Sequence, residues 1–260
     1  MKLLDPAIKA FFLVNPSNPG SHSLGKESLM QLKEIVEQRK DLIIITDDVY
    51  GTFVNNFQSV YGIAPYNTLL VYSFSKLFGC TGWRLGLIAV NENNVCHDLL
   101  QKLPEKEKCI LDSDYAIVTT DTRQLPIWER ICADSRSIGL YHTSGLSTPQ
   151  QCLMALFSLT HLVCQKQEDK YFKSADAMVA RRYHILCEAL GIPEDNSAAN
   201  AKYYTIIDIY HIAEQKYGKD FRIYLENNFE QIDFLMRLSQ EKGLVLMEGM
   251  GFDAPAGTLR

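Results

Sequence analysis

The sequence predicts an α/β fold with a mainly parallel sheet, and three observations support this. Short apolar runs rich in β-branched residues recur along the first ninety residues, each ends in a polar or turn-forming segment, and a helical pattern separates the first two. Buried strands that alternate with helices are typical of parallel sheets, whose ligand sites lie at the carboxyl ends of the strands. We therefore expect the functional residues at those strand ends.

The elements of this first part of the chain follow from its apolar spacing. Four apolar runs predict the strands of the sheet: residues 10–14, 42–46, 69–74 and 85–90. A helix is predicted between the first two strands, because four apolar residues recur there at helical spacing: Leu29, Leu32, Ile35 and Val36. The first strand runs into a loop dense in turn formers, Asn15 to Gly20.

The second half of the chain predicts a further, smaller α+β domain. Residues 91–148 look less regular, with a solvated or inserted charged stretch at 101–108, before a buried helix at 149–162 and a long amphipathic helix at 165–190. Beyond these, the patterns predict strands at 203–207 and 244–247 and helices around 221–226 and 229–242. The expected domains are a large domain at 1–165, a connecting helix and linker at 166–200, and a small domain at 201–260.

Composition and charge exclude several classes of protein. Hydrophobic residues make up 47% of the 260 residues and charged residues 22%, which is typical of a globular protein rather than a disordered or fibrous one. The net charge of -5 offers no basic stripe for nucleic acid. No apolar run approaches the roughly 20 residues of a membrane span, and the amino terminus has no signal-like segment, so we expect a cytoplasmic protein.

Metal and disulfide chemistry find no support in the sequence. The seven cysteines are odd in number and contain no C-x-x-C pair, so we expect reduced core residues, and no histidine has metal-ligand spacing. The segment from Gly20 to Lys26 matches seven places of a phosphate-binding P-loop. Its eighth place is Glu27 instead of the serine or threonine that binds magnesium, which argues against that site.

The segment from Ser73 to Arg84 holds the residues that a pyridoxal phosphate site needs. Lys76 follows a buried strand and supplies an amine for a Schiff base, while Ser73, Ser75 and Arg84 supply hydroxyl and guanidinium donors for a phosphate. The other strand ends supply matching parts, listed in chain order: the amide of Asn18, the carboxylate of Asp47 for a pyridinium nitrogen, and the phenol of Tyr50. Each residue alone has an ordinary structural explanation, as a turn, a helix cap or a solvated lysine. Their order along the predicted strand ends favours the functional one.

These motifs resemble the class I/II aminotransferases, which are fold-type I enzymes that depend on pyridoxal 5′-phosphate. The resemblance rests on three segments: Asn15–Gly20, Asp47–Tyr50 and Ser73–Lys76 with Arg84. Two further segments, Phe11–Pro19 and His142–Gln151 continuing into Ala155–Leu159, resemble the branch of that family that combines aspartate transamination with aspartate β-decarboxylation. Compared with the family, the chain looks like a fragment cut at both ends, so we expect these residues alone to be inactive and prone to aggregation.

The resemblance implies a role for each site residue. Lys76 binds the cofactor covalently and moves protons, Tyr50 assists as a second catalytic residue, and Asp47 pairs with the pyridine nitrogen. Asn18 and Tyr50 bind the phenolic oxygen of the cofactor, and its phosphate is bound by Ser73, Ser75 and Arg84. Arg260 would grip the substrate α-carboxylate, beside Asn18. No metal is implied.

The expected activity is conversion of L-aspartate to L-alanine and carbon dioxide, with transamination as a side activity. A plain aminotransferase of the same fold and an inactive fragment of such an enzyme remain alternatives. The loop from His142 to Thr148 resembles a segment that reaches a neighbouring subunit's site, which implies at least a homodimer. His142 is a weaker candidate for a functional residue than for a structural one.

Overall fold

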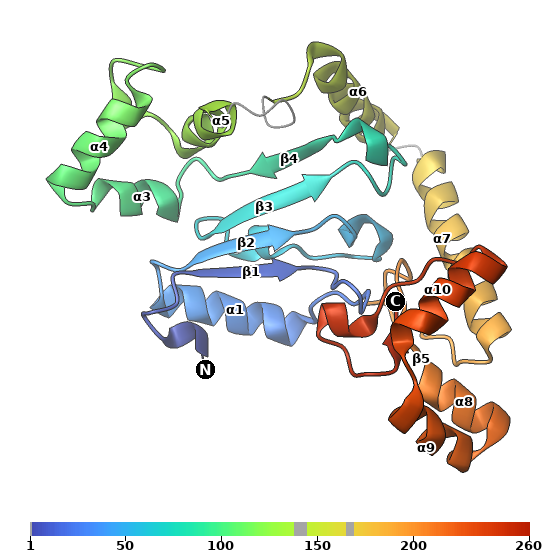
Figure 1. The fold of residues 1–260 in the computed structure, drawn as a ribbon. Helices are drawn as coiled ribbons and strands as arrows, with labels where there is room; N and C mark the ends of the chain where they lie inside the picture. Colours follow the sequence, from blue (N-terminus) through green and yellow to red (C-terminus); the bar gives the residue numbers. More distant parts are fainter. Residues whose placement is uncertain (1, 138–144, 165–168) are drawn as a thin grey trace. The chain divides into compact units, whose positions relative to one another are not determined.

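A computed structural model describes residues 2–137, 145–164 and 169–260 of the chain (Figure 1). The chain divides into two compact units. The first unit contains residues 1–14, 24–49 and 58–169, and the second contains residues 15–23, 50–57 and 170–260. Two short loops of the early sequence, which follow the first two strands, thus belong to the unit that the carboxyl-terminal third of the chain forms.

The first unit contains a four-stranded sheet in the order β1-β2-β3-β4. Its strands are β1 (Ala10–Val14), β2 (Ile43–Asp47), β3 (Thr68–Ser73) and β4 (Gly86–Ala89). The first three strands are parallel and β4 is antiparallel to β3, with Ser73 opposite Gly86. The mainly parallel sheet predicted from the sequence is confirmed, and its carboxyl-terminal edge places Asp47 and Ser73 at the ends of neighbouring strands.

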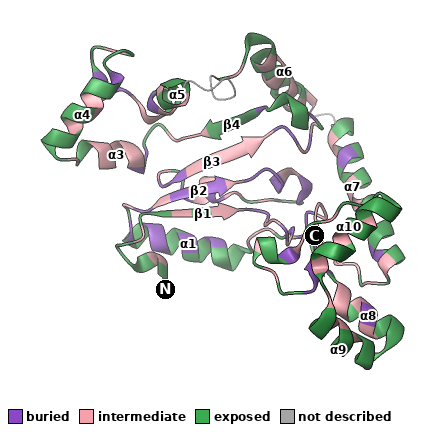
Figure 2. Cartoon of the chain, in the orientation of Figure 1, coloured by how far each residue is buried: buried purple, intermediate pink, exposed green. Residues whose placement is uncertain are grey.

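Helix α1 (Lys26–Gln38) covers part of this sheet. All four apolar residues that predicted it are buried, and they pack with Leu42, Ile44, Val60 and Ala64 in one cluster. Figure 2 shows buried residues on both α1 and β2. Leu42 and Ile44 are 0% exposed, so this buried cluster stabilises the strand that ends at Asp47.

Residues 95–137 are more regular than the sequence suggested. They form α3 (Val95–Gln101), α4 (Glu105–Tyr115), the 3-10 turn η4 (Thr122–Gln124) and α5 (Ile127–Ser137). Short helices with mixed faces give weak periodicity, but local contacts hold these: the Asn94 side chain caps α3, and the Tyr115 hydroxyl donates to Asp134 across α4 and α5. The charged residues of 101–108 are mostly exposed, as expected.

Helix α6 (Thr148–Cys164) is present as predicted, but the expectation that it is buried was wrong. One side packs on the loop after β3, where the Phe157 ring stacks on Phe78 at 4.9 Å between centroids. Four apolar residues on other sides are more than half exposed: Leu156, Leu159, Leu162 and Val163. Part of the apolar surface of this helix is therefore not covered by any other described part of the chain.

The second unit is mainly helical. Its helices are α7 (Lys170–Leu190), α8 (Ile209–Tyr217), α9 (Lys219–Asn228) and α10 (Gln231–Lys242). A two-stranded antiparallel sheet joins β5 (Ile207–Asp208) to β6 (Thr258–Leu259). The remaining short elements lie in both units: η1 (Lys2–Leu4), η2 (Gly51–Phe53), α2 (Val60–Ile63), η3 (Thr81–Trp83) and η6 (Gly249–Phe252).

Two expectations for the second unit were wrong, and one helix was missed. Of the strand predicted at 203–207, only Ile207 is in a strand, as the first residue of β5. The backbone N–H groups of Tyr203 and Tyr204 donate to the Ser21 side chain instead of to a neighbouring strand. The predicted strand 244–247 is irregular, although Met247 exchanges backbone hydrogen bonds with Arg260. Helix α8 was not predicted; its cap is Asp208, whose carboxylate accepts the His211 backbone N–H at 2.9 Å.

The cysteines correct one further expectation. All seven are free thiols, but only Cys80 and Cys187 are buried, whereas Cys109, Cys132 and Cys152 are exposed. The interpretation of the cysteines as core residues was therefore wrong for these three. Within the described ranges, none of the helices has the length and apolar character needed to cross a membrane.

Candidate active site

The predicted lysine lies in the connection between β3 and β4, residues 74–85, which we call the lysine loop. The loop is closed on itself: the Thr81 hydroxyl donates to the Ser75 carbonyl at 3.0 Å, and the Cys80 thiol lies 3.0 Å from the Phe74 carbonyl. At its base, the Phe74 N–H donates to the Leu85 carbonyl at 3.0 Å. This framework fixes Lys76 just beyond the carboxyl end of β3.

Asp47, the last residue of β2, is the predicted partner for a pyridinium nitrogen. Its Oδ1 accepts the Val49 backbone N–H at 3.1 Å. Burial raises the pKa of Asp47, while the Val49 hydrogen bond and the positive charge of Lys76 lower it. A partly desolvated carboxylate within the field of a lysine is suited to hold a cationic ring nitrogen, because a buried charge is stabilised by an opposite one.

The predicted phosphate ligands also lie in or beside the lysine loop. The Ser73 hydroxyl donates to the Ser75 hydroxyl at 2.9 Å and accepts the Ser75 backbone N–H at 3.2 Å. Arg84 is exposed and has a φ of 54°, a left-handed conformation, and its Nη1 donates to the Thr81 carbonyl at 3.2 Å. The segment from Ser73 to Arg84 therefore carries two hydroxyl groups and a guanidinium, which are donor types that suit a phosphate dianion.

Three predicted residues belong to the second unit: Asn18, Tyr50 and Arg260. The Arg260 Nη1 donates to the Asn18 Oδ1 at 3.1 Å, although 242 residues separate them in the sequence. The Tyr50 hydroxyl lies 2.7 Å from the hydroxyl of Tyr204. Within this unit the structure therefore brings Asn18 and Arg260 together, and Tyr204 connects the same region to Tyr50.

An aromatic cluster supports these residues, and the sequence analysis missed it. The Arg260 guanidinium carbon lies 4.3 Å from the ring centroid of Tyr204 and 4.5 Å from that of Phe252. The Tyr203 ring packs at 5.1 Å from both Tyr50 and Phe53. Nothing in local spacing links positions 50, 204, 252 and 260, so only the tertiary fold reveals this group.

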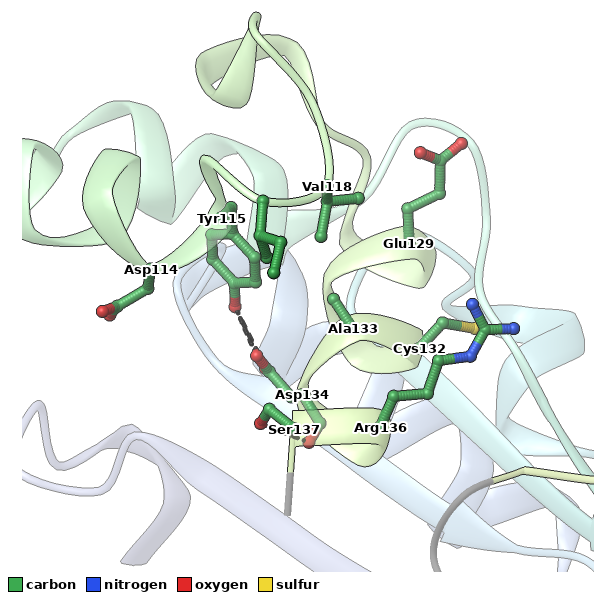
Figure 3. Close-up of a pocket in the computed structure, with 10 residues that line it drawn as sticks. Asp114, Tyr115, Val118, Glu129, Cys132, Ala133, Asp134, Arg136 and Ser137 are labelled. Carbon is green, nitrogen blue, oxygen red and sulfur yellow. Dashed lines mark hydrogen bonds between the residues drawn. The ribbon is translucent and has the colours of Figure 1, made fainter. Parts of the chain in front are cut away.

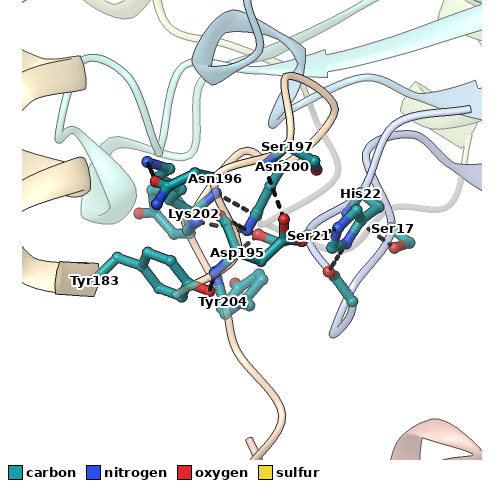
Figure 4. A network of polar contacts seen from close by, with 12 residues as sticks. Ser17, Ser21, His22, Tyr183, Asp195, Asn196, Ser197, Asn200, Lys202 and Tyr204 are labelled. Atoms are coloured by element: carbon teal, nitrogen blue, oxygen red, sulfur yellow. Dashed lines mark hydrogen bonds and ion pairs between the residues drawn. The ribbon is translucent and has the colours of Figure 1, made fainter. Parts of the chain in front are cut away.

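The loop that carries Asn18 is held by a network of polar contacts (Figure 4). Ser21 is buried with a φ of 61°, and its hydroxyl accepts the backbone N–H groups of Tyr203 and Tyr204 at 3.0 and 2.9 Å. Nearby, the His22 Nε2 lies 2.6 Å from the Asp195 carboxylate. The segment read as a possible P-loop therefore serves to anchor the 195–204 region.

A separate pocket of about 970 Å³ lies between α4 and α5 (Figure 3). Its lining includes Tyr115, Glu129, Cys132, Asp134 and Arg136. None of the predicted site residues lines it, so it does not belong to the candidate site. His142, the weaker functional candidate, lies outside the described residues.

The comparisons with known sequences agree with the motifs. Residues 1–106 match the family model described as aminotransferase class I and II. A bifunctional aspartate aminotransferase and L-aspartate beta-decarboxylase from a Pseudomonas species is 46% identical over 259 residues, which is 98% of this chain and 48% of that protein. An aspartate aminotransferase from Pyrococcus abyssi is 36% identical over 93 residues, 34% of this chain and 24% of the relative.

Solved structures show the same fold. A PLP-dependent aminotransferase from Streptococcus suis 89-1591 matches with a TM-score of 0.63 at 19% identity, over 100% of this chain and 53% of that one. A mutant aspartate aminotransferase from Thermus thermophilus matches with a TM-score of 0.58 at 20% identity, over 96% and 54% of the two chains. Identities this low support the fold alone.

The fold is that of the fold-type I, PLP-dependent aminotransferases, and the resemblance of the sequence to class I and II aminotransferases is confirmed. Among the relatives described here, the bifunctional Pseudomonas protein is the one that the chain follows over nearly its whole length. The chain spans about half the length of that relative. Pyridoxal 5′-phosphate is the cofactor that this family match implies, and the donor set around Lys76 and Asp47 fits it.

Proposed function

We propose that the complete protein uses pyridoxal 5′-phosphate to convert L-aspartate to L-alanine and carbon dioxide, with aspartate transamination as a side activity. The structural observation that carries this proposal is Lys76 beyond the end of β3, within electrostatic reach of the half-buried Asp47 at the end of β2. The 46% identity to a bifunctional aminotransferase and β-decarboxylase supports the choice of reaction.

In the first unit, the proposed roles are attachment, protonation and anchoring of the cofactor. When bound, pyridoxal phosphate supplies an electron sink for the carbon that carries the substrate amino group. The Lys76 amine holds the cofactor and, once released, takes the proton from the substrate Cα. Asp47 keeps the ring nitrogen protonated, and the donors of Ser73, Ser75 and Arg84 bind the phosphate.

In the second unit, the proposed roles concern orientation. Arg260 binds the substrate α-carboxylate, since a planar guanidinium makes two parallel charge-assisted bonds to it. Asn18 supports Arg260 through its Oδ1, and the amide of Asn18 and the hydroxyl of Tyr50 bind the phenolic oxygen of the cofactor. The reaction breaks the bond from Cβ to its carboxylate, and Cβ takes up one proton, so each aspartate gives one alanine and one carbon dioxide.

A plain aspartate aminotransferase is the second candidate, favoured by the shorter matches to aspartate aminotransferases. The two are separated by supplying aspartate and pyridoxal phosphate without a keto acid. A decarboxylase continues to release carbon dioxide, whereas an aminotransferase stops after one half-reaction. If the protein forms no visible absorbance band with bound pyridoxal phosphate, the third alternative is favoured, namely that this chain is an inactive fragment of such an enzyme.

The remaining parts of the proposal concern assembly and location. We propose that the protein forms at least a homodimer and acts on a small amino-acid substrate in the cytoplasm. We also propose that the chain divides into a large domain at 1–165, a connecting helix and linker at 166–200, and a small domain at 201–260. Measurement of the mass of the complete protein in solution tests the homodimer, and a stable, fully active monomer would contradict it.

A further inference from the structure

Tyr204 contacts two residues that the proposed function places at the cofactor and at the substrate. Its hydroxyl lies 2.7 Å from the hydroxyl of Tyr50, and their rings meet edge to face at 5.1 Å and 75°. The face of the same ring lies against the Arg260 guanidinium, 4.3 Å from the guanidinium carbon to the ring centroid. All three residues belong to the second unit.

The backbone of Tyr204 is held independently of its side chain. Its N–H donates to the Ser21 hydroxyl at 2.9 Å, and the Ala201 N–H donates to the Ser21 carbonyl at 2.7 Å. Ser21 itself is 1% exposed. Because these anchors do not involve the phenol group, changing the hydroxyl or the ring leaves the local backbone with its main hydrogen bonds.

Arg260 lies against two aromatic rings. The guanidinium carbon lies 4.3 Å from the ring centroid of Tyr204 and 4.5 Å from that of Phe252, while the backbone N–H of Arg260 donates to the Met247 carbonyl at 2.8 Å. A cation over an aromatic ring is attracted to the ring face, and such a contact does not use the N–H donors of the guanidinium, which remain for an acceptor. The acceptor seen there is the neutral Asn18 amide oxygen, so this contact leaves the positive charge in place.

The hydrogen bond between the two phenols has a preferred direction when the cofactor oxygen is present. Each phenol carries one hydrogen. If Tyr204 donates to Tyr50, then Tyr50 keeps its own hydrogen for the anionic phenolic oxygen, and the first bond strengthens the second. The opposite direction would use the Tyr50 hydrogen on Tyr204 and leave the anionic oxygen without that donor.

We propose that Tyr204 is a positioning residue that couples the cofactor and substrate ends of the site: its hydroxyl orients the Tyr50 donor, and its ring orients Arg260. This inference rests on the proposed function. Because the hydroxyl acts on Tyr50 and the ring acts on Arg260, the two roles can be separated by substitution.

The test compares Tyr204→Phe, which removes only the hydroxyl, with Tyr204→Leu, which removes the ring as well, in the complete protein loaded with pyridoxal phosphate. The first readout is the pH at which the visible absorbance of the bound cofactor changes. The second is the dissociation constant of maleate, a four-carbon dicarboxylate, measured by calorimetry. Tyr217→Phe, an exposed tyrosine of the same unit, is the matched control.

We expect Tyr204→Phe to raise the absorbance midpoint by about 0.5 pH unit, since loss of a donor weakens stabilisation of the anionic oxygen, and to leave maleate binding unchanged. Tyr204→Leu should share that shift and also weaken maleate binding by about fivefold, the size of a lost cation–π contact. The control should match the wild-type protein in both readouts.

An unchanged midpoint in Tyr204→Phe overturns the role of the hydroxyl, and wild-type maleate affinity in Tyr204→Leu overturns the role of the ring. If Tyr204→Leu fails to fold, Phe252→Leu tests whether aromatic contacts orient Arg260: we expect weaker maleate binding, and wild-type affinity would overturn the role of the rings. If the wild-type protein forms no visible band with pyridoxal phosphate, it is the proposed function that fails, and not this coupling alone.

Discussion

Asp47 is the last residue of one strand and Lys76 follows the neighbouring parallel strand, and the positive charge of Lys76 lowers the pKa of the Asp47 carboxyl group against the larger opposing effect of burial. β2 ends at Asp47, and β3 ends three residues before Lys76. The parallel register of these two strands therefore places an amine and a carboxylate in the same region of one sheet edge. This is the arrangement on which the proposed chemistry depends.

Replacing Lys76 by alanine should abolish aspartate-dependent carbon dioxide release and transamination together. The proposed mechanism has one amine for both attachment and proton transfer, and proton transfer alone contributes about 10²- to 10⁴-fold in rate. Turnover of the complete protein measures the effect. Lys33→Ala, at an exposed lysine of α1, should keep wild-type turnover. Substantial activity in Lys76→Ala would move the attachment point to another residue.

Asp47→Asn should bind pyridoxal phosphate but turn over slowly, because a neutral amide does not keep the ring nitrogen protonated and the electron sink weakens. We expect a visible band of near-normal intensity and a fall in kcat of at least about 100-fold. Asp176→Asn, an exposed carboxylate on α7, serves as the control. A normal kcat in Asp47→Asn would show that this carboxylate does not partner the cofactor.

The sheet, with Asp47 and Ser73 at the ends of its strands, was predictable because local pattern and strand order determine it. The runs 10–14, 42–46 and 69–74 have the apolar composition of buried strands, and a polar segment near the end of each run marks where the strand ends. The structure places strands within one residue of the expected bounds at 10–14, 42–46 and 69–74. Here local preference and tertiary packing agree.

The second unit was harder to predict, because long-range contacts decide it. Tyr203 and Tyr204 have strand-forming side chains, yet the buried Ser21 hydroxyl binds both of their backbone N–H groups. The support of Arg260 by Tyr204 and Phe252 likewise has no signal in the sequence, because aromatic residues at such separations are ordinary core residues. Only the folded chain shows which aromatic side chains meet the arginine.

Leu32→Ala should destabilise the first unit far more than Met30→Ala on the same helix. Leu32 is 7% exposed within the α1 cluster, whereas Met30 is 44% exposed. Removing a buried leucine typically costs about 2 to 5 kcal/mol, whereas an exposed substitution changes stability by about 0.5 kcal/mol or less. Urea unfolding of the two variants measures the difference. Equal losses would show that α1 does not pack on the sheet as described.

The pair of His184 and Glu194 predicts a pH dependence. Their Nδ1 and Oε2 atoms lie 2.9 Å apart, and this hydrogen bond raises the pKa of His184 and lowers the pKa of Glu194. The contribution of His184 is complete below its ordinary pKa of 6.5 and is lost as the pH rises through the raised value. That of Glu194 is present above its ordinary pKa of 4.5 and is lost as the pH falls through the lowered value.

Glu194→Gln should therefore lower the His184 pKa measured by NMR, and any stability it costs should be greatest between about pH 4.5 and 6.5. His184 is exposed and Glu194 is partly exposed, so solvent screens the pair, the stability effect is small and the NMR titration is the sharper measurement. An unchanged His184 titration would mean that the pair does not form in solution.

The proposed reaction is tested most directly by the origin of the released carbon dioxide. The complete protein, loaded with pyridoxal phosphate and given no keto acid, receives L-aspartate labelled with ¹³C at either C1 or C4. Our account predicts labelled carbon dioxide from the C4-labelled substrate alone, together with an equal amount of alanine and many turnovers per site. Label released from C1, or no sustained release from either substrate while aspartate is transaminated once a keto acid is added, would contradict it.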